Sequence, residues 1–591
     1  MNKEFKLPEG FEDAKVVEET PVEQERTFEG DMKFCFSYID NVMQLPEKPT
    51  RAPGKDGQPG EMLDPTPKRE KYRMCCDKVR QVMKRWGKFY NVGHVTTYVP
   101  DHTRQNIQII RDDQTFTEFL RPFGLLAGDT VTTMIAKDLG SYADQCESKI
   151  IYLMSHYDPQ RHVLYVNEYN GNFLKIDGDG KVTRLRNGDE GMLFEWGVGK
   201  FDPLCADLFF ANLWTLGSAL NPNGGVGEML IRDEILDVVK YADDGLGRDN
   251  AHLLLMGCLL ALYFQERIKA VPLVCFTGLG GSMKSALVKR VGKLIVGHKF
   301  EMTDCPEGMN AIAQLKDLAI SMPFIGLDEA NRIGDLSNIL KTIATGGADT
   351  RRRLYTTSTM ETKPYQARLW MTMNTGDPRE ETVASRMLIF DAAKPEGKAP
   401  YRATIHLEWS AEKRNALWTE LVGRLAMAMQ RLKIAEERGK ADAKVTHRMS
   451  DFFVFLTALA EGEATPNELP QYHLPTRVKK AMEATESRQQ TAISDALEIV
   501  DVLTRASHTL NGQMMTAKEW GAALEKFTGE HDEVRRSLRK KNWVAWTFKA
   551  NERLLEERFG MTKQIDSHRK LTFFSFSKLS GNPAYVEEPE G

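Results

Sequence analysis

Residues 274–285 read Val-Cys-Phe-Thr-Gly-Leu-Gly-Gly-Ser-Met-Lys-Ser and join an apolar run to an amphipathic stretch that begins at Ala286. The apolar run predicts a strand, and the amphipathic stretch predicts a helix. Glycines in such a turn let backbone N–H groups face an anion, and the amino end of the helix adds partial positive charge. Lys284 then suits the β- and γ-phosphates of a nucleotide, and the Ser285 hydroxyl suits Mg²⁺. The stretch therefore predicts a phosphate-binding loop.

One residue departs from the motif, because Met283 stands where its last glycine is expected. A side chain is tolerated there if its Cβ points away from the phosphates. The loop residues expected to contact nucleotide are Gly278, Leu279, Gly280, Gly281, Ser282, Met283, Lys284 and Ser285.

A second acidic motif follows about forty residues later, where Phe324-Ile-Gly-Leu leads into Asp328-Glu329. Two acids at the end of an apolar strand predict a Walker B site, in which Asp328 completes the Mg²⁺ shell and Glu329 polarises the attacking water. A strand that ends in a helix-capping Asp explains the pair equally well when it is taken alone. Its position behind a phosphate loop favours the nucleotide site.

Two further polar residues flank later apolar strands. Asn374 ends the run Ala367-Arg-Leu-Trp-Met-Thr-Met, and Arg386 enters the run Met387-Leu-Ile-Phe. Asn374 could orient the attacking water, or it could simply form a turn before Gly376-Asp-Pro. Arg386 could act as an arginine finger, or it could pair with a carboxylate at a strand edge.

In this order the motifs resemble those of superfamily 3 helicases, which are AAA+ motors of small viruses, phages and plasmids. The most similar members are replicative ATPases of phages and mobile elements, related to poxvirus-type primase-helicases. The segments 347–356 and 447–452 are also similar to sequences before sensor 1 and after the motor core of that family. The resemblance covers roughly residues 250–460. It implies ATP and Mg²⁺ as cofactors, Asn374 as sensor 1, and a hexameric ring in which Arg386 reaches the neighbouring subunit.

The resemblance also implies a β-hairpin that projects into the channel of the ring and contacts DNA. In this chain the matching segment is 350–363, with Lys363 expected near the tip. The arginines of the segment could instead be solvated or serve the subunit interface. The candidate DNA-binding residues here are Arg351, Arg352, Arg353 and Lys363.

A second basic patch lies in the tail, where a basic helix followed by strands 544–549 and 571–576 fits a winged helix. A solvated helix face is the competing interpretation, and the aromatic residues Trp543, Trp546 and Phe548 are expected in the core. The candidate DNA-binding residues of the patch are Arg535, Arg536, Arg539 and Lys540.

Composition is that of a globular protein: 591 residues, 41% hydrophobic and 27% charged, with a net charge of -4. A net negative charge means that any DNA contact must come from local basic patches. No apolar run approaches the ~18 residues of a membrane span. The eight scattered cysteines suggest reduced thiols, so we expect a cytoplasmic protein without a membrane partner.

The expected fold class is α/β, with a parallel-sheet P-loop core of the AAA+ type between a mixed α+β region and a winged-helix-like region. The expected divisions are an acidic, proline-rich flexible segment at 1–70, a mixed α+β domain at 71–200, a helical collar or linker at 201–267, the ATPase core at 268–400, a helical region at 401–500 and a winged-helix-like domain at 501–591. The N-terminal region shows no carboxylate cluster that would predict a primase.

The leading functional hypothesis is an ATP-hydrolysing, ring-forming DNA helicase or translocase in the replication of a phage or mobile element. The alternative is an ATP-controlled initiator or assembly protein that binds DNA, single-stranded or forked, without unwinding it. A degenerate nucleotide-binding scaffold is a third hypothesis, motivated by Met283. The other motif positions hold the residues that the motifs expect, which argues against this third hypothesis.

Overall fold

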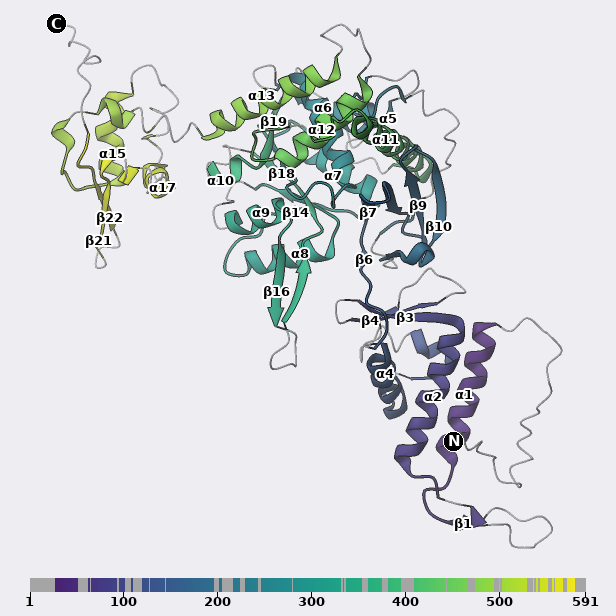
Figure 1. Cartoon of the computed structure of the whole chain (residues 1–591). Coiled ribbons are helices and arrows are strands. Elements are labelled where there is room, and N and C mark those ends of the chain that lie inside the picture. The colour runs from purple at the N-terminus through teal and green to yellow at the C-terminus, as the bar shows by residue number, and fades with distance from the viewer. Residues whose placement is uncertain are drawn as a thin grey trace, which may run out of the picture.

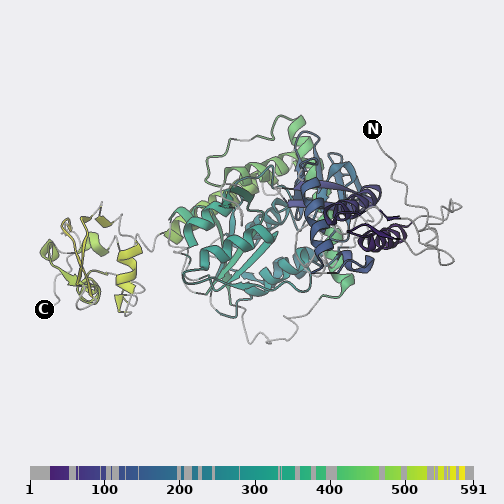
Figure 2. The same cartoon turned by 90° about the horizontal axis from the view of Figure 1, so that it is seen from below.

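The computed structural model of the chain is a mixed α/β structure whose elements fall into three groups along the sequence (Figure 1). The structure describes residues 27–51, 62–63, 65–92, 95–100, 108–109, 119–126, 128–143, 145–195, 201–204, 216–223, 229–242, 246–278, 280–330, 333, 336–352, 360–374, 381–394, 409–442, 444–464, 473–493, 499, 502–506, 508–528, 535, 538–539, 543–550, 555–556, 559–566 and 571–579. Figure 2 shows the same elements from below.

The first group packs helices against a small antiparallel sheet. Helix α1 begins where the Thr27 side chain accepts a hydrogen bond of 3.1 Å from the backbone of Gly30. Apolar side chains recur at helical spacing from Phe28 to Val42 and share one core with α2 and α4. This corrects the expectation of a flexible segment over 1–70, because that spacing buries a complete helix face. The bounds are α1 Phe28–Gln44, β1 Thr50–Arg51, β2 Met62–Leu63, α2 Lys68–Trp86, β3 Gly87–Val92, β4 Val95–Pro100, β5 Gln108–Ile109, η2 Arg121–Phe123 and α4 Thr130–Ala143.

A β-meander opens the second group. Its strands pair antiparallel in the order β10-β9-β8-β7, and the Asn170-Gly171 and Asp177-Gly178 sequences, which favour tight turns, stand between them. The meander shares its core with the central sheet, and Ser155 Oγ donates a hydrogen bond of 3.0 Å to the carbonyl of Tyr263. The expected domain at 71–200 is therefore divided near its middle, because the meander buries its apolar face against the core that it shares with the central sheet. The bounds are β6 Ile151–Tyr152, β7 Ser155–Asp158, β8 Val163–Asn167, β9 Asn172–Asp177, β10 Val182–Arg186, η3 Asp189–Gly191 and β11 Leu193–Phe194.

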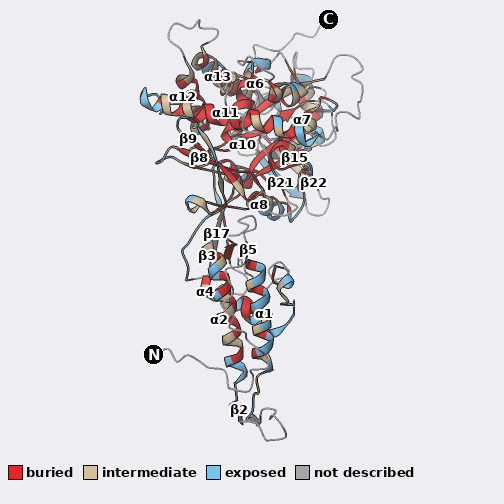
Figure 3. Cartoon of the chain, turned by 90° about the vertical axis from the view of Figure 1, so that its right-hand side faces the viewer, coloured by how far each residue is buried: buried red, intermediate tan, exposed pale blue. Residues whose placement is uncertain are grey.

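The central sheet has the strand order β12-β19-β13-β18-β15-β14 among the described residues. All neighbouring strands run parallel except β12, which pairs antiparallel with β19 at the edge. Apolar side chains cover both faces of the sheet, which explains why its inner strands read as continuous apolar runs (Figure 3). Because β13, β15 and β18 run parallel, the residues that follow them meet at the carboxyl ends of the strands. The bounds are β13 Leu273–Thr277, α7 Lys284–Ile295, β14 Thr303–Asp304, α8 Ala311–Ser321, β15 Phe324–Asp328, α9 Ser337–Ala344, β16 Ala348–Arg352, β17 Met360–Pro364, β18 Arg368–Met373, α10 Glu381–Ala384 and β19 Met387–Ala393.

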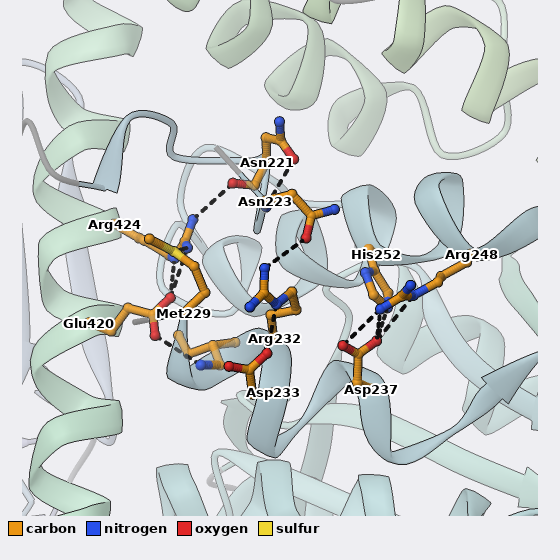
Figure 4. A network of polar contacts seen from close by, with 11 residues as sticks. Asn221, Asn223, Met229, Arg232, Asp233, Asp237, Arg248, His252, Glu420 and Arg424 are labelled. Atoms are coloured by element: carbon orange, nitrogen blue, oxygen red, sulfur yellow. Dashed lines mark hydrogen bonds and ion pairs between the residues drawn. The ribbon is translucent and has the colours of Figure 1, made fainter. Parts of the chain in front are cut away.

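A buried ion pair within α11 holds this helix against segments that precede the sheet (Figure 4). Arg424 is fully buried, and its Nε donates a hydrogen bond of 2.8 Å to Glu420 Oε1. The other carboxylate oxygen of Glu420 accepts from Ile231 N at 2.8 Å, and Arg424 Nη1 donates to Ser218 O at 3.0 Å. Removing either charge would leave the other buried without its partner. The bounds are α5 Leu230–Glu234, η5 Leu236–Val238, β12 Lys240–Tyr241, α6 Gly247–Ala261, α11 Ala411–Glu437, α12 Ser450–Glu463 and α13 Leu474–Ile493.

The third group has its own core and a three-stranded antiparallel sheet in the order β20-β22-β21. The strand expected at 544–549 is instead the helix α17, because Val544 and Phe548, four residues apart, both enter this core. The expected strand at 571–576 is confirmed as β22. Phe548 is buried as predicted, and Trp543 packs partly buried against the same core. The bounds are η8 His508–Leu510, β20 Met515–Thr516, α15 Ala517–Leu524, η9 Glu525–Phe527, α17 Trp543–Ala550, β21 Thr562–Asp566 and β22 Leu571–Ser575.

Two further observations concern the apolar character of the helices and the state of the cysteines. Among the described helices, none is long and apolar enough to cross a membrane. The described cysteines are free thiols, and burial raises the pKa of Cys75 to about 11. A thiol with a raised pKa is a poor nucleophile, so this cysteine serves packing.

Candidate nucleotide site

The glycine-rich loop leaves β13 in tight contact with the neighbouring strand. Gly278 has φ +136°, and a Cβ atom there would lie 2.3 Å from the carbonyl oxygen of Ala392. Only glycine fits this conformation and this approach. Leu279 lies outside the described residues. The loop therefore starts from a fixed point on the sheet.

Met283 adopts the left-handed conformation that a glycine would adopt without strain, with φ 69° and ψ 11°. Its side chain is half-buried and packs against the hydrophobic core of the central body. The side chain thus has a place in the core, which explains how the loop accommodates methionine at this position.

Lys284 begins helix α7 and is 4% exposed. Its Nζ donates hydrogen bonds to the carbonyl of Gly278 at 2.7 Å and to Ser282 Oγ at 3.1 Å. Burial lowers the pKa of Lys284, and the negative charge of Asp328 opposes that effect. The ammonium group therefore lies within the curve of the loop, where it can exchange these oxygens for those of a phosphate.

Ser285 and Asp328 form the second part of the site. The Ser285 hydroxyl donates a hydrogen bond of 2.9 Å to Asp328 Oδ1, although the two residues lie on different elements. Thr372 Oγ1, in β18, donates to the same carboxylate oxygen. Hydroxyl and carboxylate oxygens are the ligands that Mg²⁺ prefers. The donor set fits the expected magnesium ion.

Glu329 lies just beyond β15, where its backbone has φ 50°. Its carboxylate oxygen Oε1 accepts a hydrogen bond of 3.0 Å from Asn374 Nδ2. Sidechains at Asn374 and Thr372 lie on the same side of β18, since they are two residues apart. Thr372 was missed by the sequence interpretation, although this alternation could have identified it.

Arg386 lies at the amino ends of the parallel strands, whereas the glycine-rich loop lies at their carboxyl ends. Its carbonyl accepts from Leu273 N at 2.9 Å, at the start of β13, whereas the glycine-rich loop follows the end of that strand. The guanidinium donates to the carbonyl of Thr382, whose hydroxyl accepts from Lys341 Nζ at 3.3 Å. Burial and the positive charge of Arg448 lower the pKa of Arg386. Several cations therefore gather at the amino ends of the strands.

An ion pair that the sequence interpretation did not identify connects α13 to the start of the loop. Asp391, in β19, accepts from Thr277 Oγ1 and from Arg488 Nη2, the latter at 2.7 Å. The Arg488 side chain is 11% exposed. Because Thr277 is followed directly by Gly278, this contact couples the position of α13 to the loop.

The expected hairpin is present as β16 and β17, but Lys363 does not lie at its tip. Lys363 is opposite Asp349 in the pairing, one residue from the end of the ladder at Ala348 and Pro364. Lys363 lies near the base because the strands continue past it toward Arg352. Arg353 and the turn lie outside the described residues, as do the side chains of Arg351 and Arg352.

The basic patch of the tail is only partly described. Arg535 Nε donates a hydrogen bond of 3.1 Å to Thr528 Oγ1, and Arg539 Nε donates one of 2.7 Å to Glu525 Oε1. Both contacts lie within the third group, so they orient the two guanidinium groups. Arg536 and Lys540 lie outside the described residues.

Known proteins of solved structure resemble this chain only weakly. No family model matches the chain, and neither does any curated protein. A structure described as the A form apo structure of the NrS-1 C terminal region has a TM-score of 0.32 and 11% identity over 84% of this chain and 98% of that chain. One described as SCCmec type IV Cch, an active helicase, has a TM-score of 0.36 and 11% identity over 82% of this chain and 90% of that chain. These values carry no argument about activity, so the proposal below rests on the site.

Proposed function

We propose that the protein is an ATP-hydrolysing, ring-forming DNA helicase or translocase that acts in the replication of a phage or mobile element. The observation that carries the proposal is the meeting of Lys284, Ser285, Asp328, Glu329 and Asn374 at one edge of a parallel sheet. A capping role for Asp328 does not account for its contacts with the hydroxyls of two other elements. The site is what phosphoryl transfer needs, which is positioning and charge neutralisation.

In this proposal the loop backbone and Lys284 hold the phosphates. Ser285 and Asp328 hold Mg²⁺, which supplies positive charge to the phosphate oxygens when it is bound. Glu329 accepts a hydrogen bond from the attacking water and orients it. Asn374 keeps the Glu329 carboxylate in place through the hydrogen bond of 3.0 Å.

The strand order also supports a P-loop core of the AAA+ superfamily 3 type. The loop strand β13 lies between β18 and β19, and β15 with its acidic end lies one strand further. In this arrangement Arg386 faces away from the nucleotide of its own subunit, since it lies at the far end of β19. A ring, hexameric in the proposal, would bring it to the γ-phosphate of a neighbour.

A second candidate function is an ATP-controlled initiator that binds DNA without unwinding it. The third group favours this candidate, because helical residues 502–505 precede the order β20, α15, α17, β21, β22. That order is typical of winged helices, in which the second helix of the helix-turn-helix contacts DNA.

The experiment that separates the two candidates is strand displacement on a forked DNA duplex with ATP. A helicase displaces the strand with the wild-type chain and fails to do so with Lys284→Ala. An initiator shows DNA-dependent ATP hydrolysis without displacement. Absence of ATP hydrolysis with every DNA form would contradict both.

A further inference from the structure

Helix α2 carries a concentration of positive charge that the rest of the chain does not share. Of its 19 residues eight are Lys or Arg and two are Asp or Glu, while the whole chain has a net charge of -4. Its inward face is apolar and enters the core of the first group through residues such as Val79 and Met83. Lys71 is buried, where it donates to the carbonyl of Met43 at 3.2 Å, and the other seven basic side chains of the helix are exposed or half-buried.

The outward face borders an open groove between α2 and α4 with a volume of about 710 Å³. Arg69 and Arg73, one helical turn apart and both exposed, line it from α2, and Lys137 lines it from α4. Two acidic residues, Glu70 and Asp138, also line the groove beside its three cations, and Asp138 is paired with Arg80 at 3.1 Å. The groove thus has a positive wall that suits a chain of phosphates.

Aromatic side chains alternate with these cations. Tyr72 lines the groove, and Lys68 Nζ lies 5.8 Å from the centre of its ring. On the other side of α2, Phe34 is 58% exposed, and Lys78 Nζ lies 5.4 Å from the centre of its ring. Exposed rings beside cations are the platform on which unpaired bases stack, whereas a duplex keeps its bases stacked on one another.

We propose that the outward face of α2 and its groove with α4 bind single-stranded DNA. Arg69 and Arg73 contact the phosphates, and Tyr72 stacks on a base. This site goes beyond the proposed motor, because it needs no nucleotide and lies in a different group of elements. It gives the N-terminal region a role in holding the strand.

The test measures binding of the nucleotide-free, full-length chain to a labelled oligothymidine by fluorescence anisotropy over a range of salt concentrations. Arg69→Ala/Arg73→Ala should weaken binding, and the slope of log K against log salt should fall by about 1.4, since each lost phosphate contact contributes about 0.7. Lys479→Ala/Lys480→Ala, which removes two exposed lysines of α13, is the matched control and should leave the slope unchanged. Equal slopes for both double variants would overturn the proposal.

Stacking is tested at Tyr72. Tyr72→Ala should weaken binding about tenfold, and Tyr72→Phe should retain the affinity, because stacking on a base needs only the ring. Equal affinity of the wild-type chain for a duplex of the same length would overturn the single-strand assignment. Lys284→Ala should bind the oligonucleotide like the wild-type chain, so a failed ATPase and a failed DNA site give different results.

Discussion

Asn374 Nδ2 and Glu329 Oε1 are joined by a hydrogen bond of 3.0 Å across the ends of β18 and β15. The two residues are 45 positions apart in the chain, yet the parallel sheet brings them together at the edge where the glycine-rich loop lies. An amide that donates to a carboxylate fixes its orientation and leaves the second oxygen for a water molecule. This geometry agrees with the proposed role of Glu329, which is to orient the attacking water.

Glu329→Gln should retain ATP binding and lose hydrolysis by more than tenfold. The substitution removes the carboxylate that orients the water, while Lys284, Ser285 and Asp328 remain in place. A loss of about tenfold corresponds to ~1.4 kcal/mol in the barrier. Binding of a fluorescent nucleotide and the rate of phosphate release measure the two effects. Turnover that persists within tenfold would show that Glu329 is not the catalytic carboxylate.

Met283→Gly should preserve or raise ATP hydrolysis. Glycine relieves the left-handed conformation of Met283, which costs a residue with a side chain about 1 kcal/mol. Relief of this conformation should raise folding stability, whereas loss of the half-buried side chain should lower it. Thermal unfolding should therefore be measured alongside the rate of ATP hydrolysis. A clear loss of nucleotide binding would contradict the interpretation, since it would mean that the methionine side chain holds the loop open.

Arg386→Ala should abolish hydrolysis and retain ATP binding. The guanidinium lies at the end of β19 that is far from its own loop, so in the proposed ring it would serve the nucleotide of a neighbouring copy. Such fingers contribute about 10³–10⁵ in rate. Full activity of the single variant would refute this role, and a chain that no longer folds would favour a structural ion pair.

Assemblies that mix two inactive variants test the proposed role of Arg386 in a second way. A Glu329→Gln subunit retains Arg386, and an Arg386→Ala subunit retains Glu329, so one complete site forms where the first donates to the second. Mixed assemblies of the two inactive variants should therefore regain part of the activity, measured as phosphate release against the mixing ratio.

Arg488→Ala should lower the temperature of unfolding, because the half-buried Asp391 would lose its partner at 2.7 Å. Arg488→Ala/Asp391→Asn should recover part of the loss, since the neutral amide can still accept from Thr277. The non-additive part of the double-mutant cycle measures the coupling between α13 and the loop. Strict additivity would mean that the contact contributes nothing.

The sequence predicts the strands that border the candidate site better than it predicts the surrounding elements, and the reason is local. The loop, Asp328 and Asn374 each follow a strand that is buried on both faces, so their strands read as apolar runs. The site of Asp391 and Arg488 joins residues 97 positions apart, and no local pattern marks it.

Helix α17 was predicted as a strand because its aromatic and β-branched residues favour strands, and packing decided otherwise. Val544 and Phe548 enter one core only if they lie on one face of a helix. The expectation of a flexible segment over residues 1–70 was wrong for a similar reason. The apolar residues of α1 recur at helical spacing, but prolines and charges dominate the rest of residues 1–70, and packing on α2 stabilises the helix.

The central claim is that Lys284 belongs to a working nucleotide site. The most direct measurement compares ATP hydrolysis by the wild-type chain and by Lys284→Ala, each with and without single-stranded DNA. We expect hydrolysis that DNA stimulates in the wild-type chain and that falls to background in the variant, because no other described ammonium lies within the curve of the loop. Hydrolysis by Lys284→Ala at the wild-type rate would contradict it.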